Sequence, residues 1–408
     1  MECRFCKTTV NKQFADLINS PASNSYLRAA QLNEPEVFFP LKVMVCEKCF
    51  LVQVDEYKKS ADIFNNDYAY FSSFSTSWLA HCKKYTDMMT GRFGFGANSL
   101  VAEIASNDGY LLQYFKEKNV PVLGIEPTAN TAAVAIEKGI PTVVDFFGVK
   151  LATKLAGEGK QADLLLGNNV LAHVPDINDF VGGMKVMLKA NGVITMEFPH
   201  LYQLVLNNQF DTIYHEHFSY LSFSTVSRIF DAQGLVMFDV EEIPTHGGSL
   251  RIFAKHNNDN SNPVSERVAA LLKKEKDAGM LSIDYYSNFQ DKIETIKMNL
   301  LEFLLQQKKA GKTVAAYGAA AKGNTLLNYC GVKKDLVSFV VDANPHKQNK
   351  FMPASHIPIC NEDMIRETKP DFILILPWNI KEEITKQLSY VNNWGCKFVV
   401  PVPKLEVL

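Results

Sequence analysis

The chain lacks the sequence features of membrane, secreted and nucleic-acid-binding proteins. No apolar run approaches the roughly 20 residues that span a bilayer. The start MECRFCKTTV has no apolar stretch behind a basic end, so it does not resemble a secretory signal. Neither sign of charge dominates, because 42 Lys and Arg face 44 Asp and Glu and leave a net charge of −2. We therefore expect a cytoplasmic protein with no nucleic-acid or membrane partner and no evident obligate protein partner.

Cysteine is scarce, but four of the eight cysteines lie in two CxxC pairs, Cys3/Cys6 and Cys46/Cys49. Such pairs are typical of a tetrahedral zinc site with Zn–S distances of about 2.3 Å. Four unrelated free thiols are the alternative, and a redox motif is disfavoured because neither pair opens a helix after a strand. Four protein ligands leave no open coordination position. The sequence therefore predicts a structural zinc ion.

Strand and helix signals alternate in two stretches of the chain, which favours parallel sheets covered by helices. The 408 residues are enough for two or three domains. Strands are predicted at residues 101–105, 122–125, 164–166 and 193–198, and again at 313–317, 337–342, 372–376 and 398–400. Short strands are predicted at 38–41 and 43–45, a helix at 76–90, a hairpin of strands 236–243 and 248–255, and one or two helices within 264–309.

The predicted fold class is α/β, with three domains. A zinc-binding domain is expected at 1–70, a Rossmann-like domain at 71–245 and a second Rossmann-like domain at 246–408.

The turn after the first predicted strand of the middle domain lacks repeated glycines. Its sequence EIASNDGYLL offers acidic and amide side chains, which suit a cationic ligand better than a phosphate. Glu126 ends the next strand, 23 residues after Glu103, where an acid binds ribose hydroxyls. S-adenosylmethionine carries a sulfonium and an ammonium group and no phosphate, so this turn favours it over NAD; a Rossmann unit without ligand is the alternative. The predicted cofactor residues are Glu103, Ala105, Ser106, Asn107, Asp108, Gly109, Glu126, Pro127, Asp145, Phe146, Phe147, Asn168 and Asn169.

The corresponding turn of the C-terminal domain has the opposite chemistry. It reads GAAAKGN, in which small residues let backbone N–H groups approach an anion and a lysine adds positive charge. This turn suits a diphosphate; the alternative for Lys322 is a solvated lysine at a helix start. The predicted substrate-binding residues are Arg251, Gly318, Ala319, Lys322, Gly323, Asn324 and Asp342.

The tract FDTIYHEHFSYLS places Tyr214, His215, Glu216 and His217 in a row. Four ionisable or polar groups flanked by aromatic residues favour a reacting centre over a packed histidine. If the tract is extended, Tyr214 and Glu216 point to one side and the two histidines to the other. A metal site through the two histidines is an alternative, but the tract offers no evident third ligand.

Taken together, the motifs resemble the S-adenosylmethionine-dependent C-methyltransferases of nucleotide-activated keto-deoxy sugars, over essentially the whole chain. They include the four cysteines, the pair Tyr68/Tyr70 before Ser72-Ser73, NNVLAHV at 168–174, YHEH at 214–217, HGGS at 246–249, GAAAKGN at 318–324 and PWN at 377–379. The resemblance implies a zinc-bearing N-terminal domain, a middle cofactor domain and a C-terminal domain that helps to hold the nucleotide sugar.

The resemblance also implies C3 methylation of a nucleoside-diphosphate 4-keto-6-deoxy sugar. His217 would be the base, surrounded by Tyr214, Glu216, His173 and one of Tyr68 and Tyr70, with Tyr70 preferred. A 4-ketone acidifies the C3 proton, and a neutral imidazole can remove it near physiological pH. The enolate then needs a hydrogen-bond donor, for which a tyrosine hydroxyl, an imidazole or an ordered water could serve.

Two departures from the family pattern stand out. Residues 345–349 read PHKQN and 353–354 read PA, where the family commonly has glycine at the end of each motif, which bears on the nucleotide and the loop geometry. Ala105 stands where glycine is common. The rival interpretations are an NAD-dependent nucleotide-sugar oxidoreductase using the C-terminal unit and a non-catalytic zinc protein that binds a nucleotide sugar. A binding module would not need the YHEH tract.

Overall fold

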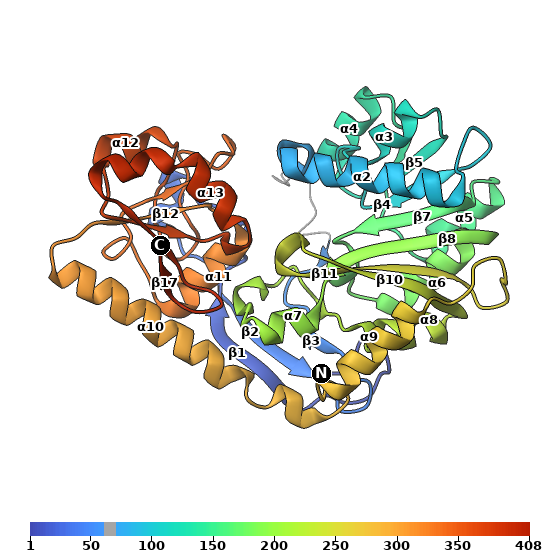
Figure 1. The fold of residues 1–408 in the computed structure, drawn as a ribbon, viewed down its shortest axis with the longest axis horizontal. Coiled ribbons are helices and arrows are strands. Elements are labelled where there is room, and N and C mark those ends of the chain that lie inside the picture. The colour runs from blue at the N-terminus through green and yellow to red at the C-terminus, as the bar shows by residue number, and fades with distance from the viewer. Residues whose placement is uncertain (61–70) are drawn as a thin grey trace.

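The computed structural model describes residues 1–60 and 71–408 and contains three sheets. Figure 1 shows the middle and C-terminal sheets as two lobes, with the N-terminal strands β1 and β2 running beneath them. This arrangement confirms the predicted α/β architecture of a zinc-binding N-terminal part, a Rossmann-like middle domain and a further α/β domain. In the part of the chain that the structure describes, no helix is long and apolar enough to cross a membrane.

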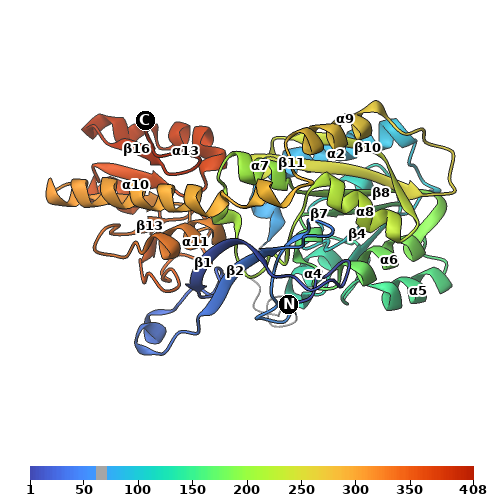
Figure 2. The same ribbon diagram turned by 90° about the horizontal axis from the view of Figure 1, so that it is seen from below.

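The N-terminal sheet is antiparallel and is completed by a strand from the middle of the chain. Its strands are β1 (Lys12–Ser20), β2 (Phe39–Val45), β3 (Val52–Val54) and β9 (Ser219–Tyr220), in that order. The two short strands predicted at 38–41 and 43–45 form one continuous strand. Pro40 does not interrupt it, because Pro40 pairs with Asn19 beside a register shift, where the missing N–H of proline is tolerated. Figure 2 shows β1 and β2 along the junction of the lobes, and the loop between them reaches the C-terminal lobe, where Leu27 pairs with Phe351.

The middle sheet has seven strands in the order β10-β11-β8-β7-β4-β5-β6. Strands β4 to β8 are parallel, and buried residues of β4 alternate between two cores: Val101 packs on one face, Ala102 and Ile104 on the other. A sheet covered on both faces needs strands with apolar side chains on both sides. The strands are β4 (Val101–Ile104), β5 (Val122–Ile125), β6 (Thr142–Val143), β7 (Ala162–Asn168), β8 (Leu188–Pro199), β10 (Leu235–Ile243) and β11 (Ser249–His256).

Helices cover both faces of this sheet. Buried residues of α2, α3 and α4 belong to one core, and those of α5, α6, α8 and α9 to the other. The helices are α2 (Thr76–Phe93), α3 (Leu112–Glu117), α4 (Ala129–Glu137), α5 (Val149–Gly157), α6 (Ile177–Met187), α8 (Phe223–Ala232) and α9 (Glu266–Asp277). Helix α7 (Leu201–Leu206) packs instead in the core of the C-terminal lobe.

The boundary predicted between residues 245 and 246 falls within a strand hairpin of the middle sheet. It cuts the β10–β11 hairpin, whereas β11 pairs with both β10 and β8 inside the middle sheet. Strand pairing therefore carries this sheet to His256, and α9 still packs on it. The hairpin itself was predicted, but the antiparallel return of β11 beside β8 was not.

The C-terminal lobe is a second, mainly parallel sheet in the order β14-β13-β12-β15-β16-β17. Its core is continuous with β1 and with the tract before residue 220: Phe14 stacks on Phe289 with ring centroids 4.6 Å apart, and Phe210 packs on Tyr329. The elements are α10 (Phe289–Lys309), β12 (Val314–Tyr317), α11 (Ala321–Cys330), β13 (Val340–Val341), β14 (Ile359–Cys360), α12 (Asp363–Thr368), β15 (Phe372–Ile375), α13 (Lys381–Gln387), β16 (Lys397–Val400) and β17 (Glu406–Val407).

Candidate active site and zinc site

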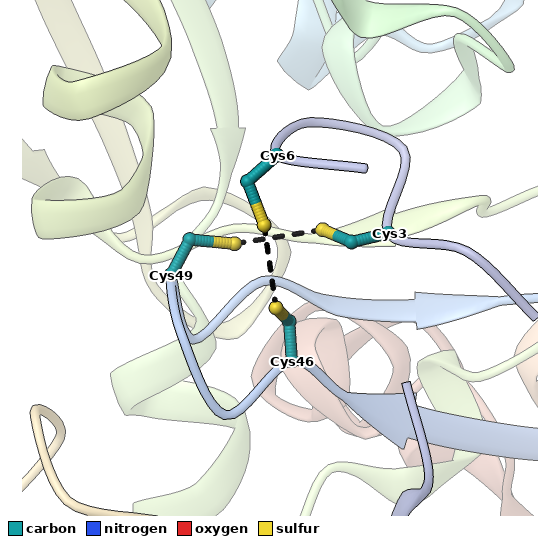
Figure 3. Close-up of side chains that lie close together, drawn as sticks. All are labelled: Cys3, Cys6, Cys46 and Cys49. Carbon is teal, nitrogen blue, oxygen red and sulfur yellow. Dashed lines mark hydrogen bonds between the residues drawn. The ribbon is translucent and has the colours of Figure 1, made fainter. Parts of the chain in front are cut away.

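The four predicted zinc ligands converge on one point (Figure 3). Their sulfur atoms all lie within 4.8 Å of one another, with Sγ–Sγ distances of 3.5 Å for Cys3–Cys49 and for Cys6–Cys46. A tetrahedron with Zn–S bonds of about 2.3 Å has edges of about 3.8 Å, so the thiols fit a zinc ion. In the described part of the chain this is the one group of side chains arranged to hold a metal ion, and His215 and His217 do not form one.

The cofactor turn of the middle domain bends through left-handed backbone. Ala105, Asn107 and Gly109 have φ of 58°, 48° and 75°. A side chain on Gly109 would also clash with Ile140. Ala105 therefore occupies a conformation that glycine adopts at less cost, which gives a physical reason for the glycine common in the family.

The acid after β5 organises this turn. One carboxylate oxygen of Glu126 accepts the N–H of Asn107 at 2.8 Å and the other accepts the N–H of Thr128 at 2.9 Å. The hydroxyl of Thr128 also donates to that second oxygen. A carboxylate has about four acceptor sites, so these bonds leave about one site for a ribose hydroxyl. Glu103 is fully buried in β4, and burial together with the nearby Glu126 and Asp108 raises its pKa well above the usual range.

Two side chains predicted to bind the cofactor form hydrogen bonds within the protein instead. Asn107 Oδ1 accepts the N–H of Ser72 at 2.9 Å, and Asp108 accepts the hydroxyl of Ser73. The segment before α2 is thereby fastened over the turn. Tyr68 and Tyr70, the predicted sugar contacts just before it, lie outside the described residues.

The remaining predicted cofactor residues lie at strand ends. Phe147 turns inward and packs on Phe180, with ring centroids 5.4 Å apart, whereas Asp145 and Phe146 are exposed. Asn168 ends β7 with a buried Nδ2 that has no partner in the described part of the chain. An unpaired buried donor there fits a polar ligand such as the methionine part of S-adenosylmethionine. Ser106 is fully buried, and Pro127 follows β5.

The YHEH tract forms a turn instead of an extended strand. The N–H of His217 donates to the carbonyl of Tyr214 at 3.0 Å, and their rings lie 4.0 Å apart. His215 instead bonds the carbonyl of Pro40 at 3.1 Å, and Glu216 accepts from Asn24 at 2.8 Å. The alternation predicted for an extended tract is therefore wrong, because the turn at 214–217 brings Tyr214 and His217 to the same side.

The imidazole of His217 is held in its neutral form. Its Nδ1 lies 2.8 Å from the carbonyl of Thr212, so Nδ1 must carry the proton and Nε2 must be the acceptor. His173 packs edge-on at 4.7 Å. Burial lowers the pKa of His217 well below its usual value, and the neighbouring His173 adds to this. Burial also lowers the pKa of His173, to about 4.

The C-terminal turn brings Lys322 towards the histidines. Its Nζ donates to Asn379 at 2.5 Å and lies 4.7 Å over the ring of Trp378. The charge of Lys322 lowers the pKa of His217, and burial lowers the pKa of Lys322 itself. The indole of Trp378 donates to Asp211 at 2.7 Å; burial raises the pKa of that acid to about 6.

The other substrate candidates surround α11. Asn324 is fully buried, and neither polar atom of its side chain has a partner in the described residues. Gly318 has φ of 92° and leaves no room for a side chain beside Pro377, and a side chain on Gly323 would meet Leu376. The carbonyl of Ala319 accepts from Tyr26 and Lys347, and Lys347 also lies 3.7 Å from Asp342.

Arg251 has partners of its own. Its guanidinium pairs with Glu197 at 2.6 Å and with Glu241 at 2.7 Å, and it lies over the ring of Tyr85. Two carboxylates therefore balance its charge within the middle sheet. Sequence reasoning missed Asn24, Tyr26 and Asp211, which reach the site only through the fold. It also gave no role to Trp378 or His246, although both lie in motifs that carried the resemblance.

Comparisons with known proteins cover all three parts of the chain. Family models match residues 3–64 as a zinc binding domain, 92–240 as a methyltransferase domain and 244–403 as a C-methyltransferase C-terminal domain. The C-methyltransferase NovU of Streptomyces niveus is 33% identical over 408 residues, which is 100% of this chain and 96% of the relative.

Solved structures show a weaker likeness. A S-adenosylmethionine-dependent methyltransferase from Clostridium acetobutylicum covers 44% of this chain and 92% of its own, at 11% identity and a TM-score of 0.36. The PH0226 protein of Pyrococcus horikoshii covers 46% of this chain and 95% of its own, at 14% identity and a TM-score of 0.39.

Proposed function

Because this chain belongs to the C-methyltransferase family, we propose that it methylates C3 of a nucleoside-diphosphate 4-keto-6-deoxy sugar in the making of a branched sugar. It is an S-adenosylmethionine-dependent enzyme and carries a structural zinc ion. The observation that carries the finer proposal is the state of His217: a neutral imidazole whose Nδ1 is fixed by Thr212 and whose Nε2 is left as an acceptor.

The proton transfer follows from this state. The 4-ketone acidifies the proton on C3, and Nε2 of His217 takes it. The C3–H electron pair becomes the C3–C4 double bond, while the carbonyl pair moves to the 4-oxygen. As that pair returns to re-form the ketone, C3 becomes the nucleophile. His217 finally releases the proton to solvent, so the base is restored.

The cofactor supplies the electrophile. S-adenosylmethionine, when bound, offers a methyl group whose bond to sulfur breaks with both electrons staying on sulfur, so that S-adenosylhomocysteine leaves. The chain's own residues would hold it: Glu126 at the ribose, and Asn168 with the turn from Ala105 to Gly109 at the methionine part. The four thiolates take no part in this chemistry, because a zinc ion with four cysteine ligands has no open position.

The surrounding residues position the sugar. Tyr214 and His173 pack on the base and would border the ring carbon that reacts. Glu216 is bonded to Asn24, and burial raises its pKa. Tyr70, or Tyr68, is proposed from the resemblance to complete this environment.

The diphosphate is proposed to lie at the start of α11. Lys322 supplies charge there, and Asn324 supplies buried polar atoms with no partner in the described residues. Small residues at Gly318 and Gly323 keep the backbone accessible. Arg251 is left out of this site, because Glu197 and Glu241 already pair with it.

The test is to incubate the protein with S-adenosylmethionine and a panel of dTDP-, CDP- and GDP-4-keto-6-deoxy sugars. Mass spectrometry should show a gain of about 14 daltons, the mass of an added CH2, on one of them, and NMR should place it on C3. The His217→Asn variant should lose turnover by at least about 100-fold while binding both ligands in calorimetry. Unchanged turnover in this variant would remove His217 from the mechanism, and a product methylated elsewhere would overturn the C3 assignment.

A further inference from the structure

His246 lies at the tip of the β10–β11 hairpin, where cofactor-side and substrate-side groups meet. Its Nε2 is 3.1 Å from Nδ2 of Asn169, the residue that directly follows β7. Gly247, next in the chain, abuts Trp378 so closely that a side chain there would clash with the indole. Trp378 in turn packs under Lys322. The hairpin tip therefore joins the end of a cofactor strand to the C-terminal lobe.

The backbone at this tip is unusual for a histidine. His246 has φ of 56° and ψ of 19°, in the left-handed region, and two glycines with φ of 91° and 114° follow it. A left-handed non-glycine residue costs free energy, and such residues gather at functional sites. Glycine would satisfy the turn at lower cost. The sequence instead keeps an imidazole, held against Trp78 with ring centroids 5.6 Å apart.

The hydrogen bond to Asn169 decides the tautomer. Nδ2 of Asn169 donates, so Nε2 of His246 accepts and the proton of the neutral ring lies on Nδ1. Burial and the nearby Lys322 lower the pKa of His246 to about 4, which keeps the ring neutral. This Nδ1–H has no hydrogen-bond partner among the residues that the structure describes. His246 thus presents a donor, whereas His217 presents an acceptor.

The two imidazoles lie within electrostatic range of each other. The charge of His246, if it were protonated, would lower the pKa of His217, and Lys322 acts on both rings. A base that takes a proton from C3 and a donor that receives the charge on the adjacent 4-oxygen are the pair that enolisation requires. A fixed neutral donor suits this task, because it stabilises the developing oxyanion without competing for the C3 proton.

We propose that His246 is a further catalytic residue, whose Nδ1–H donates to the 4-oxygen of the sugar as the enolate forms. This inference rests on the proposed function and deepens it, because it names the group that stabilises the charge. No bond to His246 forms or breaks: the proton stays on Nδ1 throughout and the oxyanion reverts to a ketone when C3 is methylated.

The experiment measures enolisation apart from methyl transfer. In D2O with S-adenosylhomocysteine in place of the methyl donor, the wild-type chain should exchange the C3 hydrogen of the sugar that it methylates, seen as a gain of about 1 dalton. His246→Gly suits the left-handed backbone and removes the donor, and we expect exchange and kcat to fall together by about 100- to 1,000-fold. His246→Asn also tolerates this backbone and keeps an N–H donor, so it should retain more activity.

Two controls separate the outcomes. Thr245→Ser changes the same turn without touching the ring and should exchange at the wild-type rate. Calorimetry of His246→Gly should give an S-adenosylmethionine Kd within about twofold of wild type. Unchanged exchange with a weakened cofactor Kd would overturn the inference and make His246 a residue that positions Asn169. If the wild-type chain neither exchanges nor methylates any sugar of the panel, the proposed function fails and the inference with it.

Discussion

The tautomer of His217, the proposed base, depends on a main-chain atom five residues away. Thr212 contributes a carbonyl to Nδ1 of His217, and that single contact at 2.8 Å decides which nitrogen can accept a proton. From sequence, His217 could be identified as the proposed base through the resemblance that the YHEH tract helps to carry. Its tautomer could not, since it depends on a turn whose backbone direction the residue types do not specify.

The same limit applies to the other missed residues. Asn24 reaches Glu216 from almost 200 positions away, and Asp211 meets Trp378 across the two lobes. No local pattern marks either contact. Ala105 is the opposite case: its departure from glycine was visible in sequence, but the reason, a left-handed φ of 58°, required the structure.

The pH dependence of the rate is a prediction at this scale. Burial lowers the pKa of His217, so the ring stays neutral, and able to accept a proton, below the usual pKa of about 6.5. The acid limb of kcat/KM for the sugar, measured with saturating S-adenosylmethionine, should therefore lie below pH 6.5. A limb at or above pH 6.5 would show that a different group, or an unshifted histidine, is the base.

Strands and helices with regular burial were predicted well, and irregular ones were not. Strands β4, β5, β7 and β8 have mainly buried apolar centres, and each was predicted within a few residues of its core. Strand β1 was missed, because two register shifts against β2 break the alternation of buried and exposed residues. The continuation of the middle sheet past residue 245 was not predicted, because the return strand β11 gives no local sign of the sheet it joins.

One buried acid ties α9 to the rest of the middle domain. Glu275 accepts from His200 at 2.7 Å, from the N–H groups of Phe223 and Ser224 at the start of α8, and from the Ser224 hydroxyl. Glu275→Gln keeps the shape of the side chain but replaces one acceptor oxygen by an amide N–H donor that faces the other donors. We therefore expect the free energy of unfolding to fall by about 3 kcal/mol in a denaturant titration. As a control, Glu242→Gln breaks an exposed ion pair with Lys274 and should lower the free energy of unfolding by less than about 1 kcal/mol.

The same acid gives a signed pH effect on stability. These contacts lower the pKa of Glu275 in the folded chain. Its stabilising contribution is therefore complete above the unfolded pKa of about 4.3, and it is lost as pH falls through the depressed folded value. The difference in unfolding free energy between wild type and Glu275→Gln should therefore become smaller as the pH falls into the acid range. Equal losses at pH 7 and in acid would contradict this explanation.

At the scale of the whole molecule, the zinc site is connected to the YHEH tract through a strand. Cys46 and Cys49 lie between β2 and β3, and β3 pairs with β9, which directly follows the YHEH turn. We expect one zinc atom per chain by elemental analysis. Cys46→Ser, or treatment with a chelator, should lower Tm and activity together. As a control, Cys360→Ser changes a free thiol of the C-terminal lobe and should leave both Tm and activity unchanged. Full activity without zinc would contradict the proposed connection between the zinc site and the YHEH tract.

The shared core around Phe14, Phe210 and Phe289 has a consequence for protein engineering. The family models divide the chain at residue 244, which invites exchange of the C-terminal part between relatives as an independent cassette. That cut would separate β10 from β11. It would also place Phe289 of one relative against the residue that another relative has at the position of Phe14. A chimaera that carries residues 12–54 and 200–220 along with a transplanted lobe that begins after β11 keeps Phe14, Phe210 and Phe289 together and leaves β10 and β11 paired. It should therefore express as a folded enzyme where the simple exchange gives aggregated protein.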